Sequence, residues 1–113
     1  MQEGSRTVHD EATIIDALQI SNWSEAVFRN MRQGGLTAVN CTVSVLENFR
    51  RTIANIIEWE HMLRQHSDLI MPVHRIADIQ TAKSAGKTGI IFGFQYTTAI
   101  EEDIGLLSIF HAL

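Results

Sequence analysis

The sequence predicts an α/β protein whose parallel strands alternate with crossover helices, and three observations support this fold class. Apolar and β-branched runs of strand length occupy residues 12–21, 36–44 and 88–95. A segment with helical periodicity follows each run, so the elements alternate β, α, β, α, β, α. This order is typical of parallel sheets and β/α barrels, in which functional groups lie at the carboxyl ends of the strands.

The first strand is predicted at residues 14–20, which are β-branched and apolar but too few for a helix. A short helix follows, because Asn22 offers a capping side chain and Glu25 lies three positions further on. Its apolar stripe consists of Val27, Phe28 and Met31. Gly34 and Gly35 end this helix, since glycine accepts the left-handed conformation that follows a helix. The second strand begins directly afterwards.

Residues 47–66 carry the strongest helical pattern in the chain. The apolar stripe at 3.6-residue spacing comprises Phe49, Ile53, Ile56, Ile57 and Leu63, widened by Trp59 and Met62. We expect Trp59 and Met62 to pack against the sheet rather than to form a ligand-binding box. The opposite face is polar.

The segment between this helix and the third strand contains the sole proline. Residues 70–73 are expected to be extended around Pro72, which cannot donate a hydrogen bond inside a sheet. A helix over residues 74–85 should turn Ile76, Ile79 and Ala82 inward and stop at Gly86. The acids at 101–103 are expected in the first turn of the last helix, where the helix dipole favours negative charge.

Composition excludes several classes of protein. The 113 residues carry a formal charge of −4 with scattered Lys and Arg, so no nucleic-acid partner and no membrane partner is expected. Residues 1–11 form a polar leader without the apolar segment of a secretory signal, which favours a cytoplasmic location. Cys41 is the single cysteine and lies in an apolar strand, so a buried small hydrophobe is favoured over a reactive thiol.

The last residues indicate a larger fold. Residues 109–113 are apolar and lack a cap, and an open parallel sheet leaves two edges unpaired. A complete (β/α)8 barrel needs about 250 residues. We therefore interpret residues 12–113 as the N-terminal portion of a partial TIM barrel, about three of its eight β/α units. Exposed sheet edges and an uncovered C-terminal helix would then favour self-association.

Three segments resemble the membrane (renal) dipeptidase family. They are residues 14–21 (IIDALQIS), 32–39 (RQGGLTAV) and 77–95 (ADIQTAKSAGKTGIIFGFQ). The resemblance extends over nearly the whole chain from Thr13 onward. It implies a zinc-dependent, metallo-dependent hydrolase barrel that cleaves dipeptides or a related small amide.

The ligand positions of that family carry different residues here. Where the family has Asp-Gly-His-Asn-Asp, this chain has residues 16–20, so Leu18 and Ile20 replace a zinc histidine and a zinc aspartate. Gln95 replaces a glutamate that bridges two zinc ions. Neither Leu18 nor Ile20 can ligate a metal, so the resemblance implies zinc in the family but a dismantled site in this chain.

Polar groups near the strand ends remain as candidates for binding a ligand. The substrate-binding candidates are Gln19, Asn22, Ser44, Gln95 and Tyr96, with Asn40 and Thr42 as further polar groups. His74 and Asp78 are spaced to chelate a metal, although a solvated ion pair is the favoured interpretation.

Two functions remain open. The first is a metallodipeptidase-type hydrolase acting on a small peptide or amide substrate, of which this chain alone is an inactive fragment. The alternative is a catalytically silent barrel that binds a small molecule or serves as a structural subunit. The catalytic residues and the exact substrate are not identified by the sequence.

Overall fold

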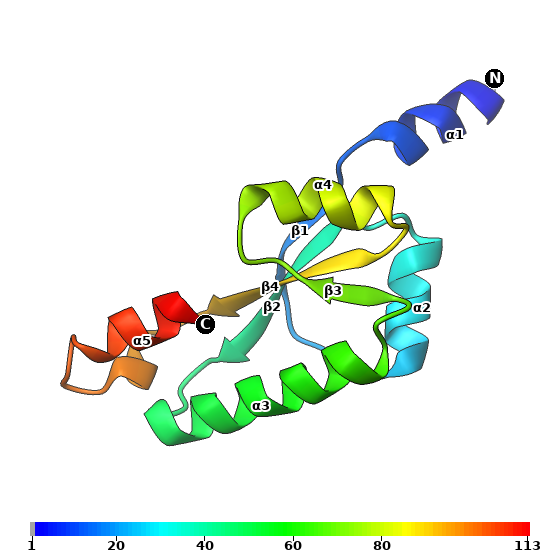
Figure 1. Cartoon of the computed structure of the whole chain (residues 1–113). Coiled ribbons are helices and arrows are strands. Elements are labelled where there is room, and N and C mark those ends of the chain that lie inside the picture. Colours follow the sequence, from blue (N-terminus) through cyan, green and yellow to red (C-terminus); the bar gives the residue numbers. More distant parts are fainter. Residues whose placement is uncertain (1) are drawn as a thin grey trace.

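The computed structural model describes the backbone of residues 2–113 and the side chains of residues 7–113. Helices and parallel strands alternate along the chain (Figure 1). The elements are α1 (Gln2–Glu11), β1 (Ile15–Gln19), α2 (Glu25–Gln33), β2 (Ala38–Ser44), α3 (Phe49–Gln65), β3 (Ile70–Pro72), α4 (Ile76–Ser84), β4 (Thr88–Phe94), the 3-10 turn η1 (Thr98–Ile100) and α5 (Leu106–Ala112). The predicted α/β class with parallel strands is confirmed.

The sheet has four strands in the order β1-β2-β4-β3, one more than the three predicted. The added strand is β3, the segment expected only to be extended. Pro72 is tolerated there because β3 lies at the edge of the sheet, where a missing amide donor costs no ladder bond. β3 pairs with Thr88, Gly89 and Ile90, so the rest of β4 has no described strand on that side.

Helices α2 and α3 cover one face of the sheet and form the core with it. Strand residues Val39, Cys41 and Ile90 point into this core, and each is at most 1% exposed. Trp59 of α3 is 3% exposed, with its ring centroid 4.9 Å from that of Trp23, so its predicted packing role is confirmed.

Helix α4 lies on the other side of the sheet. The crossovers from β1 to β2 and from β2 to β3 run in one direction across the sheet, whereas the crossover from β3 to β4 runs back. Because such connections are right-handed, the reversed crossover places α4 on the opposite face. Figure 1 shows α3 below the strands and α4 above them. We call the face away from α2 and α3 the second face.

Helix α2 begins later than predicted. Its N-cap is Ser24, whose hydroxyl accepts a hydrogen bond from the backbone amide of Val27 at 3.4 Å. Asn22, the predicted cap, is exposed. The reason is tertiary, because Trp23 packs against the core and holds the chain extended until Ser24.

The predicted inward orientation of two residues is wrong. Ile57 of α3 is 52% exposed and Ile76 of α4 is 88% exposed. Helix α3 buries a narrower stripe than expected, and the start of α4 is held by polar contacts instead of apolar packing. Ala82, which is fully buried, was placed correctly.

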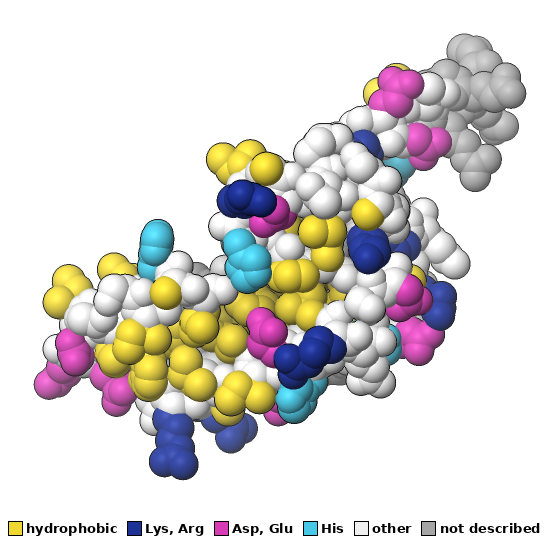
Figure 2. Space-filling model, in the orientation of Figure 1, with side chains coloured by type: hydrophobic (Ala, Val, Ile, Leu, Met, Phe, Trp, Pro, Cys, Tyr) yellow, Lys and Arg dark blue, Asp and Glu magenta, His cyan; other side chains and the backbone are white. Residues whose placement is uncertain are grey.

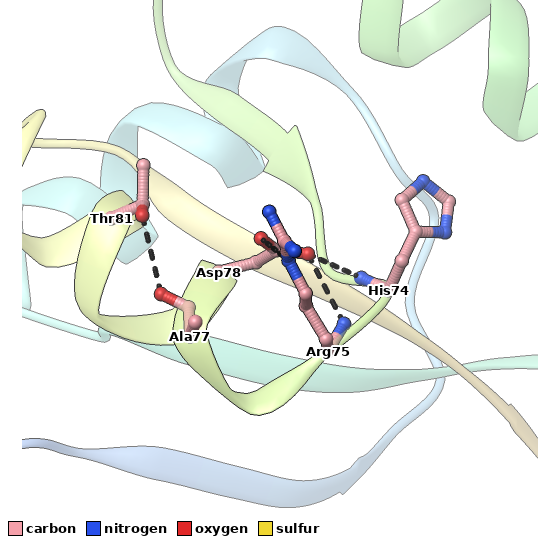
Figure 3. Close-up of polar contacts among 5 residues, drawn as sticks. All are labelled: His74, Arg75, Ala77, Asp78 and Thr81. Carbon is pink, nitrogen blue, oxygen red and sulfur yellow. Dashed lines mark hydrogen bonds and ion pairs between the residues drawn. The ribbon is translucent and has the colours of Figure 1, made fainter.

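Those polar contacts centre on Asp78 (Figure 3). Its carboxylate accepts from the backbone amides of His74 at 2.9 Å and Arg75 at 3.1 Å, and it pairs with the Arg75 guanidinium at 3.3 Å. These hydrogen bonds hold the pKa of Asp78 below its ordinary value. The His74 ring points away from Asp78, so the predicted pairing of these two side chains is wrong.

The acids at 101–103 precede the last helix rather than opening it. Glu101 adopts a positive φ of 51° after η1, and Asp103 accepts a hydrogen bond from the amide of Gly105 at 2.9 Å. Helix α5 therefore starts at Leu106. Its apolar residues remain partly uncovered, as expected, with Leu107 56% exposed and Ile109 46% exposed.

The polar leader forms helix α1, which is joined to the domain at its end. A ring nitrogen of His9 lies 2.8 Å from the carbonyl oxygen of Gly34. Lys83 donates to the carbonyl oxygens of Asp10 at 2.8 Å and Ala12 at 2.7 Å. Among the described residues, no helix is both long and apolar enough to cross a membrane.

Candidate functional site

Polar side chains meet on the second face at the carboxyl ends of β2 and β4. The Gln95 side-chain amide donates to the Thr42 hydroxyl at 3.3 Å, while the Gln95 backbone amide donates to the carbonyl of Ser44 at 3.0 Å. Asn40 lies two residues before Thr42 on β2 and therefore points to the same face. We call Asn40, Thr42 and Gln95 the strand-end cluster.

Gly93 gives Asn40 its place in this cluster. A Cβ atom on Gly93 would lie 1.8 Å from the Asn40 amide oxygen, so only glycine leaves room for that side chain. The Asn40 Oδ1 atom is buried and has no hydrogen-bond partner among the described residues. A buried acceptor without a donor is costly, which makes it a strong candidate to accept from a ligand.

Gln19 is a candidate that the structure places elsewhere. It pairs in register with Cys41, a core residue, and so turns toward the helix-covered face. A register shift in β1 between Asp16 and Gln19 produces this orientation. The Gln19 Oε1 atom is also buried and has no partner in the described part of the chain, but it does not join the strand-end cluster.

Three further candidates lie outside the cluster. Ser44 is 1% exposed and accepts a hydrogen bond from the Thr52 hydroxyl at 3.1 Å, which makes it part of the packing of α3. Asn22 is exposed in the loop between β1 and α2. Tyr96 is 57% exposed and borders an apolar hollow beside α5. Gln95 is thus the member of the predicted set that belongs to the strand-end cluster.

Cys41 takes no part in this site. Its side chain is fully buried, and burial, aided by the nearby Asp16 charge, raises the pKa of the thiol to about 12. The thiolate needed for a nucleophile or a metal ligand is therefore strongly disfavoured. The interpretation of Cys41 as a small buried hydrophobe is confirmed.

The residues present do not fit the zinc ion that the family resemblance implies. Leu18 is 57% exposed and Ile20 is 66% exposed, and neither has a donor atom. Gln95 is a neutral amide already bonded to Thr42. In the part of the chain with described side chains, no three His, Cys, Asp or Glu residues are grouped to hold a metal. What remains is a neutral cluster that can orient a ligand by hydrogen bonds.

The sequence analysis did not identify Gly93, whose missing side chain leaves room for Asn40 in the strand-end cluster. A signal was present, because an isolated glycine inside an apolar strand often marks a close approach of another group. No sequence signal indicated which face of the sheet the Gln19 side chain would join. That orientation follows from the register shift in β1, which arises only when β1 pairs with β2.

Comparisons with known proteins place this geometry in context. The chain is similar to an amidohydrolase from Pseudomonas aeruginosa of known crystal structure, with 46% sequence identity over 95% of this chain and a TM-score of 0.93. It resembles part of an amidohydrolase. The chain spans 33% of the length of that protein. No protein-family model matches the chain, and neither does any curated protein.

The amidohydrolase part of the sequence resemblance is thereby confirmed. The similarity does not show that the chain belongs to the membrane dipeptidase family. It supports the hydrolase-type part of the sequence prediction.

Proposed function

We propose that this chain forms part of an amidohydrolase-type hydrolase of the (β/α)8 barrel class, acting on a dipeptide or a related small amide. The observation that carries this proposal is the 46% identity, with a TM-score of 0.93, to a known amidohydrolase over 95% of the chain. In such barrels the loops and side chains at the carboxyl ends of the strands build the active site. The strand-end cluster lies at that end of β2 and β4.

The strand-end cluster would then bind substrate and supply no metal ligand. A peptide group presents one N–H donor and one carbonyl acceptor. The unpartnered Oδ1 of Asn40 suits the donor, and the second N–H of the Gln95 side-chain amide suits the acceptor. Any zinc chemistry of the intact hydrolase would depend on residues outside these positions.

A catalytically silent barrel is the second candidate. The observation in its favour is the pair of exposed apolar side chains, Leu18 and Ile20, at the end of β1. Neither side chain can act as an acid or a base, which favours binding of a small molecule over proton transfer at this end of β1.

Binding and hydrolysis of a simple dipeptide test the two proposals together. Equilibrium dialysis with alanylalanine should show saturable binding by the 113-residue chain, and amino-acid analysis should show no hydrolysis with or without zinc. Gln95→Leu should weaken binding, whereas the matched change Gln80→Leu at an exposed position of α4 should not.

Equal binding by both variants would contradict a substrate role for the strand-end cluster. Zinc-stimulated release of alanine by the chain would contradict the conclusion that its residues do not fit a metal.

We also propose that the isolated chain self-associates with a second copy. Beyond Ile90 no described strand pairs with this edge of β4, and a hollow of about 480 Å3 separates it from α5. Figure 2 shows hydrophobic side chains gathered over the α5 region and toward the centre of the visible face. Unpaired strand edges and large apolar patches favour association. Sedimentation should reveal a concentration-dependent mass, and a monomer at all concentrations would refute this proposal.

A further inference from the structure

A polar hollow at the opposite end of the strands is lined by two cationic side chains. It has a volume of about 290 Å3 and lies among the ends of α1, α2 and α4 and the start of β2. Arg32 comes from the last turn of α2 and Lys83 from the last turn of α4, and both line this hollow. Both side chains are half-buried.

Among the described side chains, no carboxylate forms an ion pair with either cation. Arg32 donates to the carbonyl of Leu36 at 3.0 Å and to the Thr88 hydroxyl at 3.4 Å. Lys83 donates to the carbonyls of Asp10 and Ala12. These neutral acceptors fix the two side chains without cancelling their charges. The ion pairs found among the described side chains lie elsewhere, on α2 between Arg29 and Glu25 and at the start of α4.

Both cations keep donors for a ligand. A guanidinium has five N–H groups and an ammonium has three, so the described contacts leave most of the Arg32 fork and one Lys83 donor unused. Asp10 supplies the one carboxylate in the lining, so the two permanent cations exceed it by one charge. An arginine fork beside a lysine point charge matches the several oxygens of a phosphate group.

We propose that this hollow binds a phosphate group, carried either by free phosphate or by a small phosphomonoester. The anchoring contacts hold Arg32 and Lys83 in place before a ligand arrives, which lowers the entropy cost of binding. The site is separate from the strand-end cluster, because Thr37 in its lining is three residues from Asn40 and five from Thr42 along β2, about 10 and 17 Å. It does not depend on the proposed hydrolase function.

Equilibrium dialysis with inorganic phosphate tests the site, with total ionic strength held constant by chloride. We expect saturable binding of one phosphate per chain. Arg32→Gln and Lys83→Gln should each weaken it about tenfold, the loss of one charge-assisted contact. Arg29→Gln is the matched control, because Arg29 lies on the same helix and its charge is already paired with Glu25. Glycerol 3-phosphate as competitor distinguishes the two sources, since displacement at lower concentration than free phosphate identifies a phosphomonoester site.

A measurement on the unaltered chain covers the case in which a variant does not fold. Phosphate should protect Arg32, but not Arg29, from modification by phenylglyoxal, as mapped by mass spectrometry. The proposal is overturned if phosphate binding does not saturate, if folded Arg32 and Lys83 variants bind as well as the unaltered chain, or if Arg32 is modified equally with and without phosphate.

Discussion

Replacing Gly93 with alanine should push the Asn40 side chain out of its buried position. The new Cβ would lie 1.8 Å from Oδ1, 2.7 Å from Cγ and 3.1 Å from Nδ2 of Asn40. Carbon contacts are normally about 3.5–4.0 Å long, so the whole amide must rotate away. Overpacking of this kind costs about 1–3 kcal/mol.

Two effects reduce that cost. Asn40 Oδ1 has no described partner, so moving it toward water recovers part of its desolvation penalty. Replacing glycine inside a strand also restricts the unfolded chain, a gain of about 0.5–1 kcal/mol. We therefore expect Gly93→Ala to lower the free energy of unfolding by about 1 kcal/mol.

Urea unfolding followed by circular dichroism measures this change, and a double-mutant cycle shows its cause. In an Asn40→Ala background the space beside Gly93 is free, so Gly93→Ala should become neutral or slightly stabilising. If the substitution costs the same in both backgrounds, Asn40 is not what Gly93 accommodates, and the described geometry of the strand-end cluster is refuted.

Three further predictions concern the core, the thiol and the metal. Phe28→Ala should destabilise the chain by about 3–5 kcal/mol, since Phe28 is fully buried among aromatic rings, and urea unfolding against the unaltered chain checks it. Because the fold raises the pKa of Cys41 from 9.0 to about 12, the unfolded chain loses its proton first as pH rises. The thiol's contribution to stability should therefore be complete below about pH 9 and decline toward pH 12, a slope that Cys41→Ala removes in unfolding measured against pH. The combined change Leu18→His, Ile20→Asp and Gln95→Glu should raise bound zinc per chain in elemental analysis, and unchanged zinc would mean that the geometry of the site is lost along with its ligands.

The α/β class could be predicted because it depends on local pattern. Residues 36–44 and 88–95 are short segments rich in apolar and β-branched residues, and the periodicity of residues 47–66 extends over several turns. Strand β3 has three residues, too few to carry a pattern, and pairing with β4 creates it. The start of α2 depended on tertiary packing, since Asn22 and Ser24 are equally good caps and the burial of Trp23 decides between them.

The candidate site could be predicted only in part. Gln95 was found because it follows a strand, and strand ends meet in parallel sheets. The two cations of the polar hollow could not be predicted, because Arg32 and Lys83 are far apart in sequence. They come together only when α2 and α4 pack on the sheet from opposite faces. A spacing rule cannot detect such a pair.

The register shift in β1 has a consequence for how this segment tolerates change. Three residues of β1 span the distance from Asp16 to Gln19 while β2 advances from Val39 to Cys41. The extra residue determines which side chains at the end of β1 face the core and which face the second face. Deleting Ala17 would leave two residue steps on each strand, so Gln19 would still lie opposite Cys41 and the bulge would disappear. The side chains of Leu18 and Ile20 would then stay on the second face. This segment can thus lose its extra residue without changing which side chains face the core, and a variant library should tolerate a deletion at Ala17 better than an insertion there.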